Sequence, residues 1–341
     1  MYSFRNDYSE GVHPKILQTL TETNLVQTCG YGMDDYCKEA ADQIRQLCEA
    51  PDAAVHFMVG GTQTNLIVIN SFLEDYECVI AAHTGHVNVH ETGAIEATGH
   101  KVCTAFSPDG KVTPAMVESV VAANTSEHMV LPRLVYISDT TEIGTIYTKA
   151  ELQALRACCD KHGLFLFLDG ARLASALTAE GSDLTLADLA ALTDVFTIGG
   201  TKNGLFFGEA VVLSNEKPKE HFRWYMKQRG AMLAKGRLLG IQFKGLMSDN
   251  LYFEIGRHAN AAAVRLRDGM MELGYEFPAP SPSNQQFPVL PNDVMDKLIA
   301  LGYVFEEDHV VDETHTCVRF VTSWATPMEE VEQFLKDLAA L

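Results

Sequence analysis

Short apolar runs alternate with amphipathic segments along residues 53–215, and this alternation constrains the fold more than any other feature of the sequence. It is typical of βαβ units arranged around a mainly parallel sheet. Several runs lack polar alternation, as strands covered on both faces require. The seven expected strands are Ala53–Val59, Cys78–Ala82, Lys101–Phe106, Arg133–Asp139, Leu164–Asp169, Asp194–Gly199 and Ala210–Ser214. We therefore expect an α/β fold whose large domain contains a mainly parallel seven-stranded sheet.

A second, smaller unit is expected after this alternating region. The clearest helix of the large unit is Lys149–His162, which Gly163 would end, and a further helix over Arg257–Leu273 opens the C-terminal part. Proline-rich turns and a βαβ-α tail follow that second helix. A chain of 341 residues is long enough for two cores. We expect an N-terminal segment over 1–14, a large domain over 15–245 and a smaller C-terminal α/β domain over 246–341.

Charge and composition limit the kinds of partner and the cellular compartment that we expect for this protein. The formal net charge of −19 would repel phosphate backbones and anionic lipid, which argues against nucleic acid or a membrane as the main partner. The first residues lack a secretory signal, and no window approaches the roughly 20 apolar residues that span a bilayer. The eight cysteines show no CxxC spacing and are expected to be reduced. We expect a cytoplasmic protein.

A carboxylate and a guanidinium group follow one of the expected buried strands. The segment HGLFLFLDGARL ends in Asp169 and Arg172, which would lie at the carboxyl end of the sheet. Open α/β sheets bind their ligands at that edge. The alternative is that Asp169 only forms a turn or caps a helix.

A lysine follows the next strand. The run DVFTIGG delivers Lys202 to the same edge of the sheet. A lysine that is desolvated among apolar and glycine-rich neighbours can lose its proton near neutral pH, as a Schiff-base lysine must. An ordinary surface lysine is the alternative. Together, Lys202 and Asp169 suggest pyridoxal 5'-phosphate (PLP), which needs a Schiff-base lysine and an acid beside its ring nitrogen.

A glycine turn offers a phosphate site. The segment AAVHFMVGGTQTNLIVINSF is expected to form a strand, a turn at Gly60, Gly61 and Thr62, and then a helix. The free N–H groups and the dipole of a helix N-terminus attract phosphate, and glycine lets the backbone approach it. Such a turn is common in proteins that bind no ligand. It supports a phosphate site here only because it occurs in the same chain as Asp169 and Lys202, in the expected order and spacing.

Three histidines and a glutamate lie within residues 83–91. His86 and His90 are four residues apart and would share a helix face, as zinc ligands often do. The order is not HExxH, and no cysteine pair accompanies it. We expect no metal here and interpret the histidines as structural, or as one imidazole that lies flat on an aromatic cofactor.

Taken in order, several motifs resemble one enzyme family along almost the whole chain. The motifs are NDYSEGVHP, GYGMDDY, VGGTQTN, HTGHVNVHETGA, LVYISDTTEIGTIY, LFLDGARL, FTIGGTKNG and VRFVTSW. They resemble the low-specificity L-threonine aldolases and the related β-eliminating lyases. The stretches GGTKNG and KQRGAMLAKGR look most similar to the branch that includes phenylserine aldolases. The resemblance implies the aspartate-aminotransferase fold, fold type I of the PLP-dependent transferases.

The resemblance also implies roles for individual residues. The N-terminal segment would contribute to the active site, and the substrate would be a small amino acid. Lys202 would form the Schiff base, His86 would stack on the cofactor ring, and Tyr31 would lie near the cofactor. The cofactor contacts would be Lys202, Gly61, Thr62, His86, Asp169, Arg172 and Tyr31. The substrate carboxylate would be held by Arg172 and Arg319, and His128 would lie near the substrate side chain.

Two departures from the family pattern concern the substrate and the phosphate. Asn6 stands where many members have a serine for the substrate carboxylate, and KQRGAM replaces a glycine-rich stretch. In the family that stretch lends a basic residue to a neighbouring subunit's phosphate, so either Arg229 or Lys235 would do so here. The resemblance therefore implies a homodimer or homotetramer with active sites at the subunit interface.

The expected reaction is cleavage of a β-hydroxy-α-amino acid, such as L-threonine, L-allo-threonine or phenylserine, to glycine and an aldehyde. Lys202, His86 and His128 would be catalytic, with either histidine taking the β-hydroxyl proton, because an imidazole pKa of about 6.5 suits a general base at neutral pH. One alternative is a PLP-dependent β-eliminating lyase or aminotransferase. Another is a protein without catalytic activity that binds a metal or ligand through the histidine cluster.

Overall fold

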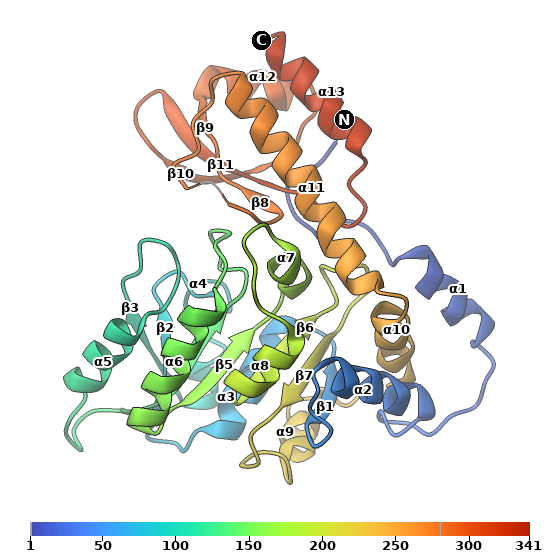
Figure 1. The fold of residues 1–341 in the computed structure, drawn as a ribbon, viewed down its shortest axis with the longest axis vertical. Helices are drawn as coiled ribbons and strands as arrows, with labels where there is room; N and C mark the ends of the chain where they lie inside the picture. Colours follow the sequence, from blue (N-terminus) through green and yellow to red (C-terminus); the bar gives the residue numbers. More distant parts are fainter. Residues whose placement is uncertain (1, 280) are drawn as a thin grey trace.

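A seven-stranded sheet forms the centre of the larger part of the molecule in the computed structural model, which describes residues 2–279 and 281–341 (Figure 1). Its strands are β1 Ala54–Met58, β2 Glu77–Ala82, β3 Lys101–Ala105, β4 Leu131–Ser138, β5 Phe165–Asp169, β6 Val195–Gly199 and β7 Glu209–Leu213. Their order is β1-β7-β6-β5-β4-β2-β3. Only β7 runs antiparallel to its neighbours. The expected α/β fold with a mainly parallel seven-stranded sheet is confirmed.

Helices cover both faces of this sheet, which explains its continuous apolar strands. Along β5, Leu166 and Leu168 join one buried cluster, whereas Phe165 and Phe167 join another on the opposite face. The helices of this part are α1 Pro14–Glu22, α2 Asp35–Leu47, α3 Gly61–Phe72, α4 His86–Val89, α5 Pro114–Ala123, α6 Lys149–His162, α7 Leu173–Thr178, α8 Leu186–Leu192, α9 Phe222–Gln228 and α10 Arg237–Met247, with a 3₁₀ turn η1 at Glu96–Thr98. Because side chains alternate along a strand, both clusters are needed to bury the sheet.

Local sequence chemistry sets the ends of α6, the helix expected most clearly from the sequence. Thr148 and Glu151 form a reciprocal capping box at its start, and the helix begins at Lys149. It ends at His162 because Gly163 adopts the left-handed conformation with φ of 64°. The expected bounds are confirmed.

A smaller antiparallel sheet lies beyond the first, shown in orange and red at the top of Figure 1. Its strands are β8 Gln285–Gln286, β9 Val289–Pro291, β10 Glu306–Val310 and β11 His315–Val321, and its helices are α11 Leu251–Glu272, α12 Asn292–Ala300 and α13 Met328–Ala339. Phe4 is fully buried in the core of this part, together with Phe320 and Phe334. The start of the chain therefore packs with its end, rather than with the large sheet.

The long helix α11 joins the two parts. Leu251, Tyr252 and Ile255 near its start belong to the core of the large sheet, whereas Leu266 and Met270 belong to the core of the small one. This packing places the change of core inside α11, later in the chain than residue 245. The expected domain bounds stay predictions. None of the helices in the described part of the chain combines the length and the hydropathy that a membrane span requires.

Candidate active site

A pocket of about 290 Å³ opens at the carboxyl ends of β4, β5 and β6. Its walls come from segments far apart in the sequence that the parallel strands bring to one edge. The lining residues are Tyr8, Val59, Gly60, Gly61, Thr62, Asn65, His86, Ser138, Thr140, Glu142, Asp169, Ala171, Arg172, Thr201, Lys202 and Glu209. The pocket thus contains Lys202, Asp169, Arg172, His86 and the glycine turn that the sequence singled out.

Asp169 ends the central strand β5 and is almost fully buried. Its Oδ2 accepts hydrogen bonds from the Tyr136 hydroxyl at 2.6 Å and from Asn65 Nδ2 at 2.9 Å. Its Oδ1 accepts one from the Ala171 backbone N–H at 2.9 Å. Three donors therefore stabilise the ionised carboxylate and fix its orientation in the pocket.

Lys202 lies in the turn that follows β6. Strand β6 is the neighbour of β5, which ends in Asp169. Burial, followed by the positive charge of Arg172, lowers the pKa of the Lys202 ammonium below its usual range, although Asp7 and Asp169 oppose the change. A neutral amine is the nucleophilic form of lysine, so this environment favours the chemistry expected of Lys202.

The glycine turn precedes α3, as expected from the sequence. The N-cap Gly60 offers no side chain to the free N–H groups of the first turn. A Cβ added at Gly60 or Gly61 would meet no heavy atom within 4 Å, so open space lies beside the backbone. Thr62 borders the same pocket. The helix N-terminus is therefore free to bind an anion.

A chain of hydrogen bonds runs from His86 to Asp169. His86 Nδ1 lies 2.9 Å from Glu91 Oε1, and the same oxygen accepts a hydrogen bond from Asn65 Nδ2 at 2.8 Å. Asn65 Nδ2 also donates to Asp169. The His86 ring is consequently oriented by a fully buried carboxylate while part of its surface stays open to the pocket.

Arg172 makes a two-pronged ion pair with Asp7 from the N-terminal segment. Its Nε and Nη2 lie 2.7 and 3.1 Å from the two Asp7 oxygens. Burial alone would raise the pKa of Asp7, but the charges of Arg172 and Lys202 outweigh it and hold that pKa below its ordinary value. Asn284 adds a third hydrogen bond to Asp7, at 2.9 Å.

Arg319 lies on β11, near enough to Arg172 for their charges to interact. Its buried Nε has no hydrogen-bond partner within the described part of the chain. Burial, followed by the charge of Arg172, lowers the pKa of the Arg319 guanidinium. A buried donor without a partner is costly, so an anionic ligand would stabilise this arrangement.

The sequence reasoning missed two carboxyl groups in the pocket. Burial raises the pKa of Glu142, and burial together with the charge of Asp169 raises the pKa of Glu209 to about 8. Glu209 begins the buried strand β7 and accepts a hydrogen bond from the Thr201 hydroxyl at 3.1 Å. A glutamate that starts an apolar strand, as in FFGEAVVL, was the signal available in the sequence.

The structure corrects the expected location of His128. This residue lies in an exposed turn just before β4, whereas the pocket lies past Ser138 at the other end of that strand. A strand of eight residues spans roughly 26 Å at 3.3 Å per residue. The chain's own His128 is therefore too far away to contact a substrate in this pocket.

Besides His128 and Arg319, four expected site residues lie outside the pocket lining. Asn6 accepts hydrogen bonds from the Tyr8 backbone and the Ser9 hydroxyl, so its oxygen stabilises a turn. Arg229 and Lys235 are exposed. Tyr31 is about half exposed and stacks with Lys227, whose Nζ lies 4.9 Å from the ring centre. None of these four side chains lines the chain's own pocket. The roles expected of them stay predictions: Asn6 at the substrate carboxylate, Tyr31 near the cofactor, and Arg229 or Lys235 at a neighbouring subunit's phosphate.

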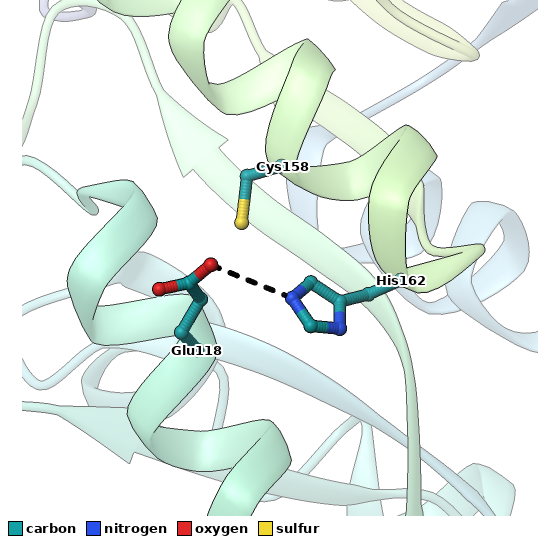
Figure 2. Close-up of side chains that lie close together, drawn as sticks. All are labelled: Glu118, Cys158 and His162. Atoms are coloured by element: carbon teal, nitrogen blue, oxygen red, sulfur yellow. Dashed lines mark ion pairs between the residues drawn. The ribbon is translucent and has the colours of Figure 1, made fainter.

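The histidines of residues 83–91 do not gather as metal ligands. Among the described residues, two groups bring ligand atoms within 4.8 Å: Glu118, Cys158 and His162, and Asp308, His309 and Cys317. Figure 2 shows the first group, which joins α5 to α6. Its Glu118 carboxylate is already paired with Lys161 at 2.6 Å. His83 instead packs against Phe106, with ring centres 4.7 Å apart and ring planes tilted by 31°.

The chain is similar to known enzymes over its whole length. A family model described as beta-eliminating lyase matches residues 5–292. A low specificity L-threonine aldolase from a Pseudomonas strain is 32% identical, over 99% of this chain and 97% of its own length. The solved structure of a Leishmania major threonine aldolase is 52% identical with a TM-score of 0.98, covering 100% of this chain and 99% of that one. A Thermus thermophilus aspartate aminotransferase shares the fold, with a TM-score of 0.72 at 14% identity, covering 99% of this chain and 91% of that one. This protein therefore belongs to the beta-eliminating lyase family and has the aspartate-aminotransferase fold.

Proposed function

We propose that this chain is a PLP-dependent aldolase that cleaves a β-hydroxy-α-amino acid, such as L-threonine, to glycine and an aldehyde. The observation that carries the proposal is the meeting of Lys202 and Asp169 in one pocket. The two threonine aldolases that are 32% and 52% identical to this chain support the same reaction.

The pocket fits PLP at three points. The uncapped N-terminus of α3 and the open space at Gly60 and Gly61 suit the phosphate. Lys202, with its lowered pKa, would hold the cofactor covalently through Nζ. Asp169, held by three donors, would keep a proton on the ring nitrogen. When bound, PLP supplies an acceptor for the electron pair that bond cleavage leaves on Cα.

Two arginines would bind the substrate carboxylate. Arg319 has a buried Nε without a partner within the described residues, and the Arg172 charge acts on the same place. Since Asp7 already occupies Nε and Nη2 of Arg172, Arg319 would supply the main hydrogen bond and Arg172 would add charge. Fixing the carboxylate orients the amino acid, and therefore determines which bond to Cα stands ready to break.

His86 would cover one face of the cofactor ring. The hydrogen bond to the buried Glu91 holds the imidazole in one orientation at the pocket wall. Asn65 couples that carboxylate to Asp169, so the groups on the ring face and the ring nitrogen belong to one network. A preorganised network of this kind orients a ligand without reorganisation during the reaction.

The test is to purify the protein, record its visible absorption with PLP, and assay L-threonine, L-allo-threonine and phenylserine. The aldolase reaction predicts glycine and an aldehyde in equal amounts. Pyruvate with ammonia would indicate β-elimination instead, and an oxo acid would indicate transamination. Absence of a bound-PLP absorption band would refute the proposal as a whole.

We propose that the enzyme is a homo-oligomer whose active sites include residues from a neighbouring subunit. Tyr31, Arg229 and Lys235 are exposed or half exposed, although they belong to the expected cofactor-binding set. Gln63, at the start of α3, donates a hydrogen bond to the Arg229 carbonyl at 3.1 Å, so this basic loop adjoins the phosphate end of the pocket. Across a two-fold interface, either Arg229 or Lys235 would reach the phosphate of the neighbouring subunit. Mass measurement in solution tests the assembly.

A cytoplasmic location is also part of the proposal. All eight cysteines are free thiols and seven are buried. Unpaired cysteines are usual in a reducing compartment and rare in secreted proteins. Fractionation of the source cells with a cytoplasmic marker enzyme tests this location.

A further inference from the structure

Glu142 occupies the wall of the pocket that lies across from Lys202. It follows β4, whereas Lys202 follows β6, and the two strands flank β5 with Asp169 at its end. Glu142 therefore approaches the ligand space from one side of Asp169, and Lys202 approaches it from the other. Both side chains line the pocket.

Two donors hold one oxygen of the Glu142 carboxylate. Oε1 accepts hydrogen bonds from the Ser138 hydroxyl at 2.7 Å and from the His86 backbone N–H at 2.9 Å. In the part of the chain that the structure describes, no donor reaches Oε2. The fixed oxygen sets the direction of the carboxyl group, and the other oxygen remains able to accept a proton.

The histidines are less suited to removing a proton from the substrate side chain. His86 has Nδ1 engaged by Glu91, and a ring stacked on the cofactor presents its face, not a nitrogen, to the ligand. His128 lies at the far end of β4. Glu142 adjoins the backbone of His86, so it stands on the same side of the pocket as the stacking ring.

We propose that Glu142 is the general base that removes the β-hydroxyl proton of the substrate. The inference rests on the proposed aldolase function. The hydroxyl proton moves to the carboxylate, and the O–H electrons form the carbonyl π bond of the aldehyde. The Cα–Cβ bond breaks at the same time and leaves its electron pair on Cα, where a later proton completes glycine. Glu142 can return its proton to solvent after the aldehyde leaves.

The surroundings of Glu142 suit a base that works near neutral pH. Burial raises the pKa of Glu142, against the hydrogen bond from Ser138, and the negative charge of Asp169 adds to the rise. The groups that face it are His86 on α4, Tyr136 on β4, Tyr147 before α6 and Asp169 at the end of β5. A carboxyl pKa above the usual range is a better match to the pH of the reaction. Activity should therefore fall on acidification as Glu142 gains a proton.

The closing experiment compares two reactions of the holoenzyme. Cleavage of L-threonine needs a base that removes the β-hydroxyl proton. Exchange of the glycine α-proton in D₂O needs a base only at Cα, because glycine has no β-hydroxyl group. Glu142→Gln should lower kcat for cleavage by about 100-fold or more, the usual loss when a general base is removed. Glycine exchange, followed by NMR, should change less than about 3-fold. The acid limb of kcat/KM should also disappear in this variant.

Each outcome has one meaning. A wild-type rate of cleavage in Glu142→Gln would overturn the inference, because the reaction would then not need this base. An equal loss of cleavage and exchange would also overturn it, because Glu142 would then serve a step that both reactions share. If the wild-type enzyme gave neither cleavage nor exchange, the proposed function itself would be wrong. Exposed Glu127→Gln is the matched control and should leave both rates unchanged. Glu142→Asp should restore part of the cleavage rate.

Discussion

Arg172 binds Asp7 through two of its nitrogens, at 2.7 and 3.1 Å, and so fastens the N-terminal segment to the strand end that carries Asp169. The two residues are 165 positions apart in the sequence. Asn284 contacts the same carboxylate from the smaller part of the molecule. One buried aspartate thus joins three distant segments directly beside the pocket.

Replacing Asp7 with asparagine should destabilise the protein. The substitution keeps the shape of the side chain but leaves Arg172 mostly buried without its counter-charge. Removing one partner of a buried ion pair costs about 3–5 kcal/mol. Urea unfolding at pH 7, followed by circular dichroism, should show a loss of this size. Asp293→Asn, which breaks the exposed pair with Lys297, is the control and should cost less than about 1 kcal/mol.

Low pH should remove the contribution of the Asp7 carboxylate to the free energy of unfolding. Its pKa is lower in the folded chain than in the unfolded one, so its stabilising effect is complete above the unfolded pKa of about 3.9. That effect is lost as the pH falls through the lower folded value. The difference in stability between wild type and Asp7→Asn should consequently shrink below about pH 4. A difference that stays constant down to pH 2 would contradict this account.

The sequence predicts the large sheet well because its signals are local. Apolar runs without alternation mark strands covered on both faces, and Thr148, Glu151 and Gly163 mark the ends of α6. The same reasoning places Asp169 and Lys202 together, since parallel strands gather their carboxyl ends at one edge. Chain order alone is enough to predict that part of the site.

Other parts of the site depend on contacts that no local pattern encodes. Asp7 meets Arg172, and Phe4 enters the core of the C-terminal part, only because the chain folds back on itself. Glu142 and Glu209 gain their unusual pKa values from burial, which a single sequence does not report for isolated polar residues. His128 precedes a strand, so its position at the amino end could have been deduced from strand direction.

Replacing Lys202 with alanine should abolish the absorption of covalently bound PLP. The side chain is the pocket lysine whose lowered pKa favours the nucleophilic amine. Far-UV circular dichroism should stay unchanged, because the residue lies in a turn after β6. Exposed Lys38→Ala should keep the native spectrum. A native absorption band in Lys202→Ala would place the covalent bond on another lysine.

Replacing Arg319 with alanine should weaken substrate binding. A charge-assisted hydrogen bond is worth about 1.5–3 kcal/mol, so KM for L-threonine should rise by roughly 10- to 100-fold. The affinity for PLP should change little, since Arg319 is absent from the residues that line the cofactor pocket. Arg319→Lys keeps the charge and should recover part of the loss. An unchanged KM would exclude a role in carboxylate binding.

Two glycines of α10 should respond differently to alanine. A Cβ at Gly240 would lie 2.4 Å from the Cys37 backbone nitrogen, whereas a Cβ at Gly245 would meet only the Ile16 side chain, at 3.0 Å. Backbone cannot move aside without separating α10 from α2, so Gly240→Ala should lower the free energy of unfolding by about 2 kcal/mol or more. Gly245→Ala should stay within about 1 kcal/mol of wild type, because alanine also gains about 1 kcal/mol of helix propensity. Parallel urea titrations compare the pair, and equal losses would contradict the packing argument.

Replacing Asp139 with asparagine should remove a loss of stability that the wild-type protein shows as the pH rises towards 8. Burial raises the pKa of Asp139 to about 8, and its Oδ1 has no hydrogen-bond partner among the described residues. The folded chain therefore keeps a proton that the unfolded chain loses near pH 4, and wild-type stability should fall by up to about 1.4 kcal/mol per pH unit between these values. Asp139→Asn removes this group and should flatten the profile measured by urea titration from pH 5 to 8, whereas the exposed Asp52→Asn should leave the slope unchanged. If wild type and Asp139→Asn kept the same slope, Asp139 would have to be ionised in the folded protein.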